Sequence, residues 1–271
     1  MATPKLFGIL NITEDSFSDG GRYLDPATAL AAAQRLAAEG ADVVDLGAAA
    51  SNIAAKPVPP DEEIRRLAPV VAALQRDGIA VSVDSFAPQT QLFALSAGVD
   101  YLNDIQGFPH PDLYRALAAS RCRLVVMHAT QGRGRAQRIA VPASGIWPRI
   151  EGFFAARIAA LEAAGIDRDR LILDPGMGFF LSADAAASFA VLARIDRLKS
   201  RFDLPVLVSV SRKSFLAAAT KRQSPAALGA ATLAAELYAA ATGVDFIRTH
   251  DPGALRDALT VTAALSRAPR Y

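Results

Sequence analysis

The sequence has little cysteine, few aromatic residues and almost no excess of charge of one sign. Cys122 is its only cysteine, which excludes a framework of intramolecular disulfides and fits a reducing cytosol. Aromatic residues make up 7% of the chain, and the formal net charge is only +2. Basic runs with interleaved aromatic residues are typical of nucleic-acid-binding proteins, so we expect no nucleic-acid partner. His and Cys residues at the spacing of a zinc site are also missing.

The chain has few apolar segments that could enter a membrane. Its start, MATPKLFGILN, contains an apolar run too short for a signal peptide, so we do not expect export. The apolar segment from Ala226 to Val244 is rich in alanine rather than leucine and contains Glu236, which favours a packed helix. We therefore expect a cytoplasmic protein without a membrane partner.

Short apolar runs alternate with longer helical patterns along the 271 residues. This alternation is typical of parallel strands joined by crossover helices. The expected strands are Leu6–Leu10, Val43–Leu46, Ala80–Val83, Tyr101–Leu102, Leu124–Met127, Leu171–Leu173, Val206–Val210 and Phe246–Ile247. A doubly wound sheet usually has fewer strands, so the pattern favours an α/β fold of the (β/α)₈ TIM-barrel type. No linker interrupts the pattern, and we expect one domain over residues 1–271.

Helix boundaries are marked in the sequence. The first helix is expected to follow Asp25 as its N-cap, to begin at Pro26 and to end before Gly40.

Nearly every expected strand ends next to a side chain that can bind or react. In a (β/α)₈ barrel these carboxyl ends surround the active site. The residues concerned are Asn11, Gly47, Asp84, Asn103, Asp104, His128, Asp174, Ser211, Arg212, Lys213, Arg248 and His250. Asp, Asn and Ser are also favoured as structural caps at such junctions. Capping could explain any one of these residues, but it explains the whole set less easily.

Two carboxylates and an amide predict the kind of ligand. Asp84 and Asp174 end apolar strands, and Asn103 ends a strand that lies between them in the sequence. A carboxylate can accept two parallel N–H bonds, so the set suits a flat heterocycle with a guanidine-like edge. Taken singly, each of these residues could equally be a structural cap.

Cationic residues follow the last two strands. Arg212 and Lys213 precede an expected helix start, where positive charge is disfavoured, which suggests an anionic or electron-rich ligand unless both reach into solvent. Arg248 and His250 suit phosphate oxygens, although the His250–Asp251 pair could instead cap the last helix. Asn11 could offer a neutral oxygen to Mg²⁺ beside a diphosphate.

Seven ordered motifs resemble the dihydropteroate synthase family across nearly the whole chain. They are GILNITEDSFSDGG, VSVDSF, YLNDI, VVMH, LILDPGMGF, SVSRKS and FIRTHD. The resemblance implies condensation of 6-hydroxymethyl-7,8-dihydropterin diphosphate with 4-aminobenzoate, and it implies a homodimer. It also implies a catalytic role for Asn11, Asp84, Lys213, Arg248 and His250.

The resemblance further assigns residues to each ligand. The pterin would be held by Asp84, Asn103, Met127, Asp174 and Lys213. Diphosphate and Mg²⁺ would be held by Asn11, Arg248 and His250. The 4-aminobenzoate would be surrounded by Ser51, Phe179, Ser211 and Lys213.

Two segments depart from the usual family pattern. The second loop reads GAAASNIA instead of GGESTRPG, so Ser51 stands for the usual threonine, and GFFLS replaces GFGK. These features are similar to the mobile, sulfonamide-insensitive branch. We expect Phe179 or Phe180 to exclude the larger drug from the 4-aminobenzoate pocket; the alternative is that Phe180 packs as ordinary core.

Two other functions remain open. A pterin-binding methyltransferase domain would use a related barrel, but its reaction releases no diphosphate. A non-catalytic pterin-binding homologue would be expected to lack some of Asn11, Asp84, Lys213 or Arg248, and all four are present.

Overall fold

The computed structural model describes residues 3–13, 25–49, 56–132, 134–222 and 224–268. Eight strands form one parallel sheet in the order β6-β5-β4-β3-β2-β1-β8-β7. Their bounds are β1 (Lys5–Asn11), β2 (Val43–Gly47), β3 (Val81–Asp84), β4 (Tyr101–Asp104), β5 (Arg123–Met127), β6 (Leu171–Asp174), β7 (Leu207–Val208) and β8 (Phe246–Thr249). A parallel bridge between Leu173 and Val206 brings the two outer strands together, so the sheet is a nearly closed barrel. The expected TIM-barrel class is confirmed.

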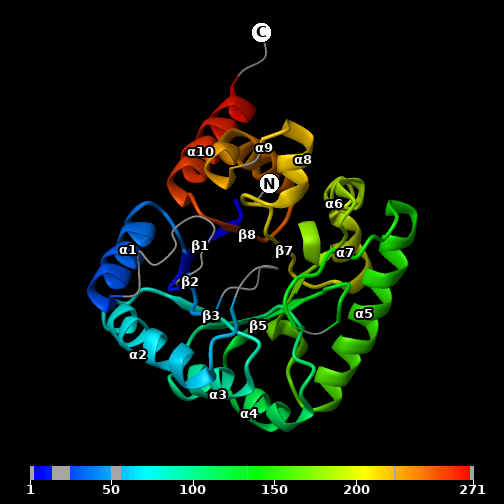
Figure 1. Cartoon of the computed structure of the whole chain (residues 1–271). Helices are drawn as coiled ribbons and strands as arrows, with labels where there is room; N and C mark the ends of the chain where they lie inside the picture. The colour runs from blue at the N-terminus through cyan, green and yellow to red at the C-terminus, as the bar shows by residue number, and fades with distance from the viewer. Residues whose placement is uncertain (1–2, 14–24, 50–55, 133, 223, 269–271) are drawn as a thin grey trace.

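Helices surround this sheet on the outside (Figure 1). The described helices are α1 (Pro26–Ala38), α2 (Pro60–Arg76), α3 (Pro88–Ser96), α4 (Tyr114–Ala119), α5 (Ala143–Ala163), α6 (Ala185–Leu192), α7 (Asp196–Phe202), α8 (Ser214–Thr220), α9 (Gly229–Ala241) and α10 (Pro252–Arg267). Two crossovers contain two helices each, α6 and α7 between β6 and β7, and α8 and α9 between β7 and β8. In the second of these, Lys221 adopts a left-handed conformation with φ of 56° and ends α8.

The first helix begins as its sequence predicts. The Asp25 carboxylate accepts the backbone N–H of Thr28 at 2.8 Å, Pro26 is the first helical residue, and Gly40 follows the end with φ of 103°. The segment expected to be a packed helix forms α9, on which Glu236 is buried. No helix in the described part of the chain is long and apolar enough to cross a membrane.

Side chains inside the barrel form tiers because successive residues of a strand point to opposite faces. The lowest tier, near the amino ends of the strands, is apolar. Its members are Phe7, Val43, Tyr101, Val125, Ile172, Leu207 and Phe246. Edge-to-face contacts join Phe7 to Tyr101 and Phe246, with ring centroids 5.0 and 5.6 Å apart. Such contacts stabilise by about 0.5–1.5 kcal/mol each beyond the burial of area.

The middle tier, two residues further along each strand, is largely polar. It consists of Ile9, Asp45, Ser82, Asn103, Met127, Asp174, Ser209 and Arg248. Burial of polar groups is unfavourable unless they find partners, so a polar tier above an apolar one marks a place for a ligand. The outward-facing residues of the same strands, Leu6, Val44 and Leu102 among them, are fully buried under the helices.

Candidate active site

Arg248 lies between two carboxylates from neighbouring strands. Its Nε donates to Asp45 Oδ2 at 2.6 Å, and its Nη2 donates to Asp84 Oδ2 at 2.8 Å. Although burial acts against it, the two carboxylates raise the pKa of Arg248. Burial raises the pKa of Asp84 to about 7, against the lowering effect of Arg248. The site therefore holds the Arg248 cation firmly between two carboxylates.

Sequence reasoning missed Asp45. Asp45 lies in the middle of β2, whereas the expected site residues stand at strand ends, and the residue at the end of β2 is Gly47. Asp45 has no exposed surface. The available signal was the single charge in the apolar run VVDLG, since a fully buried carboxylate requires a partner.

The expected heterocycle-binding residues come together on β4, β6 and the start of α8. Asp174 accepts the Gly176 N–H at 2.8 Å, and burial raises its pKa to about 6, against the effects of that bond and of Lys213. Burial, followed by the nearby Arg248, lowers the pKa of Lys213 to about 8. The buried Oδ1 of Asn103 has no hydrogen-bond partner among the described residues. An unpaired amide oxygen of this kind is ready to accept a ligand N–H.

A strained turn places Lys213 at the start of α8. Arg212, directly before it, has φ of 58°, which is uncommon for a residue with a side chain. Its backbone N–H donates to the Thr232 hydroxyl at 3.0 Å, so α9 supports this conformation. Strain of this kind is typical of functional sites.

Ser211 and His250 were expected at different ligands but lie together. Ser211 Oγ and His250 Nδ1 are 2.9 Å apart, and Ser211 Oγ also accepts the backbone N–H of His250. Burial, followed by the positive charges of Arg212 and Arg248, lowers the pKa of His250 well below its ordinary value. In the ligand-free protein these effects favour the neutral imidazole form of His250.

Phe179 and Phe180 follow β6 and pack beside Met127. Phe180 is 7% exposed and shares a small apolar cluster with Ile105, Met127, Ala129 and Ala136, while Phe179 is half-buried against it. The Nζ of Lys213 lies 5.2 Å from the centroid of the Phe180 ring. Phe180 is thus mostly packed in the core, which was the alternative expectation for this residue. Its ring also lies beside Lys213.

The loop that carries these phenylalanines depends on Gly176. Its φ is 71°, and a Cβ added there would lie 2.4 Å from the carbonyl oxygen of His128. Any other residue would therefore push the loop after β6 away from the loop after β5. The Thr130 N–H, which donates to the Phe180 carbonyl at 2.8 Å, joins the same two loops.

Two polar residues at strand ends are structural caps. Asp104 accepts the backbone N–H groups of Gln106 and Phe108 at 2.8 and 2.9 Å, which closes the turn after β4. His128 Nδ1 bonds to the Pro175 carbonyl at 3.0 Å, and burial lowers the pKa of His128 to about 4. These two residues are satisfied within the protein and have no need of a ligand.

Asn11 ends β1 at the rim of the barrel. Its Oδ1 is 3.4 Å from the place that a Cβ on Gly47 would occupy, so Gly47 keeps the space beside this oxygen free. The described residues contain no group of three or more His, Cys, Asp or Glu side chains that could hold a metal. Ser51, expected beside 4-aminobenzoate, lies outside the described residues.

The sequence and the fold match those of known proteins. The family profile of pterin binding enzymes matches residues 7–250. The type-2 dihydropteroate synthase of Escherichia coli is 62% identical, over 98% of this chain and 97% of that protein. The structure of Xanthomonas albilineans dihydropteroate synthase with 4-aminobenzoic acid has a TM-score of 0.88 at 37% identity, over 98% of this chain and 94% of the other. The same enzyme in complex with 7,8-dihydropteroate has a TM-score of 0.82 at 34% identity, with the same coverage.

The chain belongs to the family of pterin-binding enzymes and, within it, to the dihydropteroate synthases, which are transferases. The resemblance read from the seven motifs is confirmed.

Proposed function

We propose that this chain joins 6-hydroxymethyl-7,8-dihydropterin diphosphate to 4-aminobenzoate and releases diphosphate. The observation that carries this proposal is the cluster of buried Asn103 and Asp174 with half-buried Asp84, Lys213 and Arg248 above an apolar floor. It combines acceptors for a flat, N–H-rich ring with cations for a polyanion. The family and the structures of its relatives with substrate and product support the same reaction.

Asp174 and Asn103 are the inner ligands of the pterin in this proposal. Both are almost fully buried, and both keep an oxygen free for an N–H of the ring edge. Lys213 would donate to a ring acceptor, and Met127 would pack against the ring face. Asp84 would support the cation that forms on the pterin electrostatically, since it lies within the same charge cluster.

Arg248 would stabilise the diphosphate as it leaves. The C–O bond lies next to an electron-rich dihydropterin, so its cleavage gives a stabilised cation, and the main demand is to neutralise charge on the leaving group. Asn11 and His250 would complete that end of the site by oxygen and imidazole contacts. We therefore propose an SN1-like displacement without a covalent enzyme intermediate.

Mg²⁺ fits the residues at this end. A neutral oxygen such as that of Asn11 is a suitable ligand, and Mg²⁺ commonly takes few protein ligands and completes its shell with water and phosphate oxygens. The open space beside Asn11 Oδ1 supports this assignment. When bound, the ion would neutralise charge on the diphosphate.

The second substrate would approach over Lys213. Ser211, Phe179 and Ser51 are the proposed neighbours of 4-aminobenzoate, and the arylamine is nucleophilic when uncharged, so no strong base is needed. We further propose reduced sulfonamide sensitivity, with Phe179 and Phe180 restricting the space beyond the 4-aminobenzoate ring. The type-2 synthase among the relatives supports this.

Three further expectations belong to the proposal. The chain would act in the cytoplasm as a single domain and as a homodimer. Exposed Tyr238 on α9 and the exposed Val261 and Leu265 on α10 would form part of the dimer contact. Light scattering of the purified protein tests the dimer; a monomer at micromolar concentration would reject it.

Product formation tests the function directly. The purified protein is mixed with the dihydropterin diphosphate, 4-aminobenzoate and Mg²⁺, with and without a sulfonamide. Dihydropteroate formation that persists with the drug supports both parts of the proposal, and formation abolished by the drug rejects the insensitivity. If no product forms but a methyl group is transferred from methyltetrahydrofolate to a corrinoid protein, the methyltransferase alternative is favoured. If the protein binds pterin and catalyses neither reaction, the non-catalytic homologue is favoured.

A further inference from the structure

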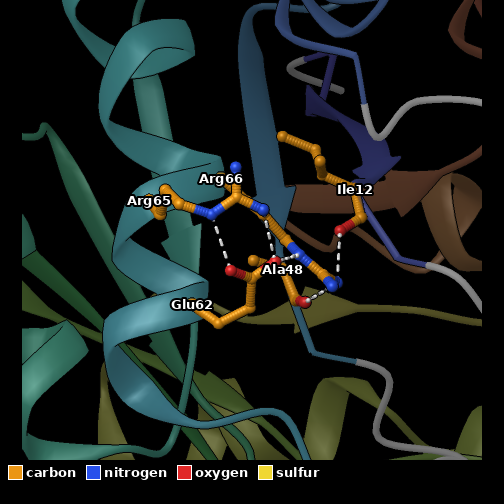
Figure 2. A network of polar contacts seen from close by, with 5 residues as sticks. All are labelled: Ile12, Ala48, Glu62, Arg65 and Arg66. Carbon is orange, nitrogen blue, oxygen red and sulfur yellow. Dashed lines mark hydrogen bonds and ion pairs between the residues drawn. The ribbon is translucent and has the colours of Figure 1, made fainter.

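Arg66 of α2 joins the beginnings of two loops that follow neighbouring strands. Its Nη1 lies 3.4 Å from the carbonyl oxygen of Ile12, after β1, and 3.4 Å from that of Ala48, after β2. Figure 2 shows the guanidinium extending from the helix to both carbonyls. One guanidinium nitrogen shared by two acceptors links both carbonyls to the helix.

Glu62 orients this guanidinium from one turn earlier on the same helix. Its Oε1 accepts the Arg66 Nε at 2.6 Å, while its carboxylate also binds Arg65, whose Nε lies 2.7 Å from Oε2 (Figure 2). Hydrogen bonds from Arg65 and then Arg66 lower the pKa of Glu62 to about 2. The two arginines differ in burial, because the side chain of Arg66 is 6% exposed and that of Arg65 is 70% exposed. A buried guanidinium needs its partners, so Arg66 is committed to this position.

The two carbonyls stand directly beside proposed site residues. Ile12 follows Asn11, and Ala48 follows Gly47, the residue that leaves space for the Asn11 oxygen. The Ile12 N–H also donates to the Gly47 carbonyl at 2.8 Å, so the two strand ends are joined to each other as well. Arg66 thus contacts the backbone directly after Asn11.

We propose that Arg66 is a positioning residue for the diphosphate end of the site, acting through Asn11. This inference rests on the proposed function. The inner pterin ligands Asn103 and Asp174 come from β4 and β6, whereas the two carbonyls that Arg66 contacts follow β1 and β2. Loss of Arg66 should therefore weaken diphosphate binding and leave binding of the pterin ring intact.

Arg65 provides a matched control on the same helix. Arg66→Met and Arg65→Met each remove one guanidinium from Glu62, but only the first removes the contacts to the two carbonyls. Arg66→Lys keeps the positive charge and loses the planar fork. Calorimetry would measure the binding of inorganic diphosphate with Mg²⁺, and separately of 6-hydroxymethylpterin without phosphate. Hydrogen exchange would follow the backbone amides of residues 12, 13, 48 and 49.

The expected pattern separates this role from a general loss of structure. Arg66→Met and Arg66→Lys should weaken diphosphate binding about tenfold, leave pterin affinity within about twofold, and speed exchange at the four amides, because small displacements of a ligating group have large effects. Arg65→Met should change none of these quantities. If Arg66→Met does not fold, Glu62→Gln should give the same pattern in weaker form, since it loosens Arg66 without removing it.

Three results would overturn the inference. The first is an Arg66→Met protein that behaves like Arg65→Met. The second is an equal loss of affinity for diphosphate and for pterin in Arg66→Met. The third is full diphosphate binding by Arg66→Lys, which would show that only the positive charge matters. If the wild-type protein binds neither probe, the proposed function is rejected instead. Amide exchange would still show whether Arg66 holds the backbone at residues 12, 13, 48 and 49.

Discussion

The Asp45 carboxylate and the Arg248 guanidinium are joined at 2.6 Å inside the barrel, where Asp45 has no contact with solvent. The two residues are 203 positions apart in the sequence, on β2 and β8. Asp84, by contrast, is 19% exposed in its side chain and pairs with another nitrogen of the same arginine. Asp45 therefore anchors Arg248, while Asp84 is the partner that can be exchanged for a ligand.

Replacement of Asp45 by Asn should destabilise the fold strongly. It leaves the Nε of Arg248 without its carboxylate partner, and breaking a buried pair in this way costs about 3–5 kcal/mol. Urea unfolding would measure the change. Glu162→Gln, which disrupts an exposed pair with Arg168, is the control and should cost less than about 1 kcal/mol. Equal effects of the two substitutions would contradict the anchoring role.

Replacement of Arg248 by Ala should slow turnover far more than it weakens pterin binding. Removal of one preorganised group that stabilises developing charge typically costs about 10²–10³ in kcat. Single-turnover rates and pterin affinity, measured on the same folded preparation, give the two quantities. An equal loss in both would count against the leaving-group role. Because Arg248→Ala also leaves Asp45 and Asp84 without their cation, its unfolding midpoint must be measured alongside.

The ionisation of Asp174 should make pterin affinity and stability change with pH in opposite ways. Burial raises its pKa to about 6, so the ligand-free folded state binds this proton more tightly than the unfolded state does. The stability that the protonated carboxyl contributes is present below the unfolded pKa and is lost as pH rises through about 6. Pterin affinity should instead rise over the same range, because the ionised carboxylate accepts N–H bonds.

Asp174→Asn isolates this effect. The variant should bind pterin weakly at every pH and should lack the fall in unfolding free energy, which amounts to about 3 kcal/mol for a pKa difference of this size. Urea unfolding at pH 5 and pH 8 would measure about half of this fall, about 1.4 kcal/mol, for both proteins, because pH 5 lies above the unfolded pKa of the carboxyl. The idea fails if wild type and variant show the same dependence on pH.

Replacement of Phe180 by Gly should restore inhibition by sulfonamides. The ring borders Lys213, and its loss would open space beside the proposed 4-aminobenzoate position. Because Phe180 is also core, the substitution should cost about 3–5 kcal/mol of stability, so inhibition must be measured well below the unfolding temperature. Phe179→Ala tests the neighbouring ring, and Phe189→Ala on α6, where the side chain is 40% exposed, is the control. Unchanged drug tolerance in Phe180→Gly would exclude that residue as the barrier.

The barrel could be predicted from the sequence because its signals are local. Apolar runs, caps such as Asp25 and the residue after each strand lie close together in the chain, and the strand ends gave Asp84, Asn103, Asp174 and Arg248 correctly as neighbours. Asp45 and Arg66 could not be placed in this way. Each acts through a partner on another strand or loop, and which interior groups meet depends on the register of a closed sheet rather than on a pattern within one element.

The same locality explains why Asp104 and His128 looked functional. Both stand at the correct edge of the sheet, yet each is satisfied by nearby backbone groups that only the folded loops bring within reach. Conversely, Ser211 and His250 looked like members of different subsites, although a bond of 2.9 Å joins them across adjacent strand ends.

The apolar lowest tier has a kinetic consequence. Phe7, Tyr101 and Phe246 close the barrel at the amino ends of the strands, so molecules reach Asp174 and Asn103 only from the opposite side. A pterin bound to Asp174 and Asn103 is covered by the second substrate when that substrate binds nearer the opening. The pterin should therefore arrive before the arylamine, and the condensed product should depart through the same opening that admitted both substrates.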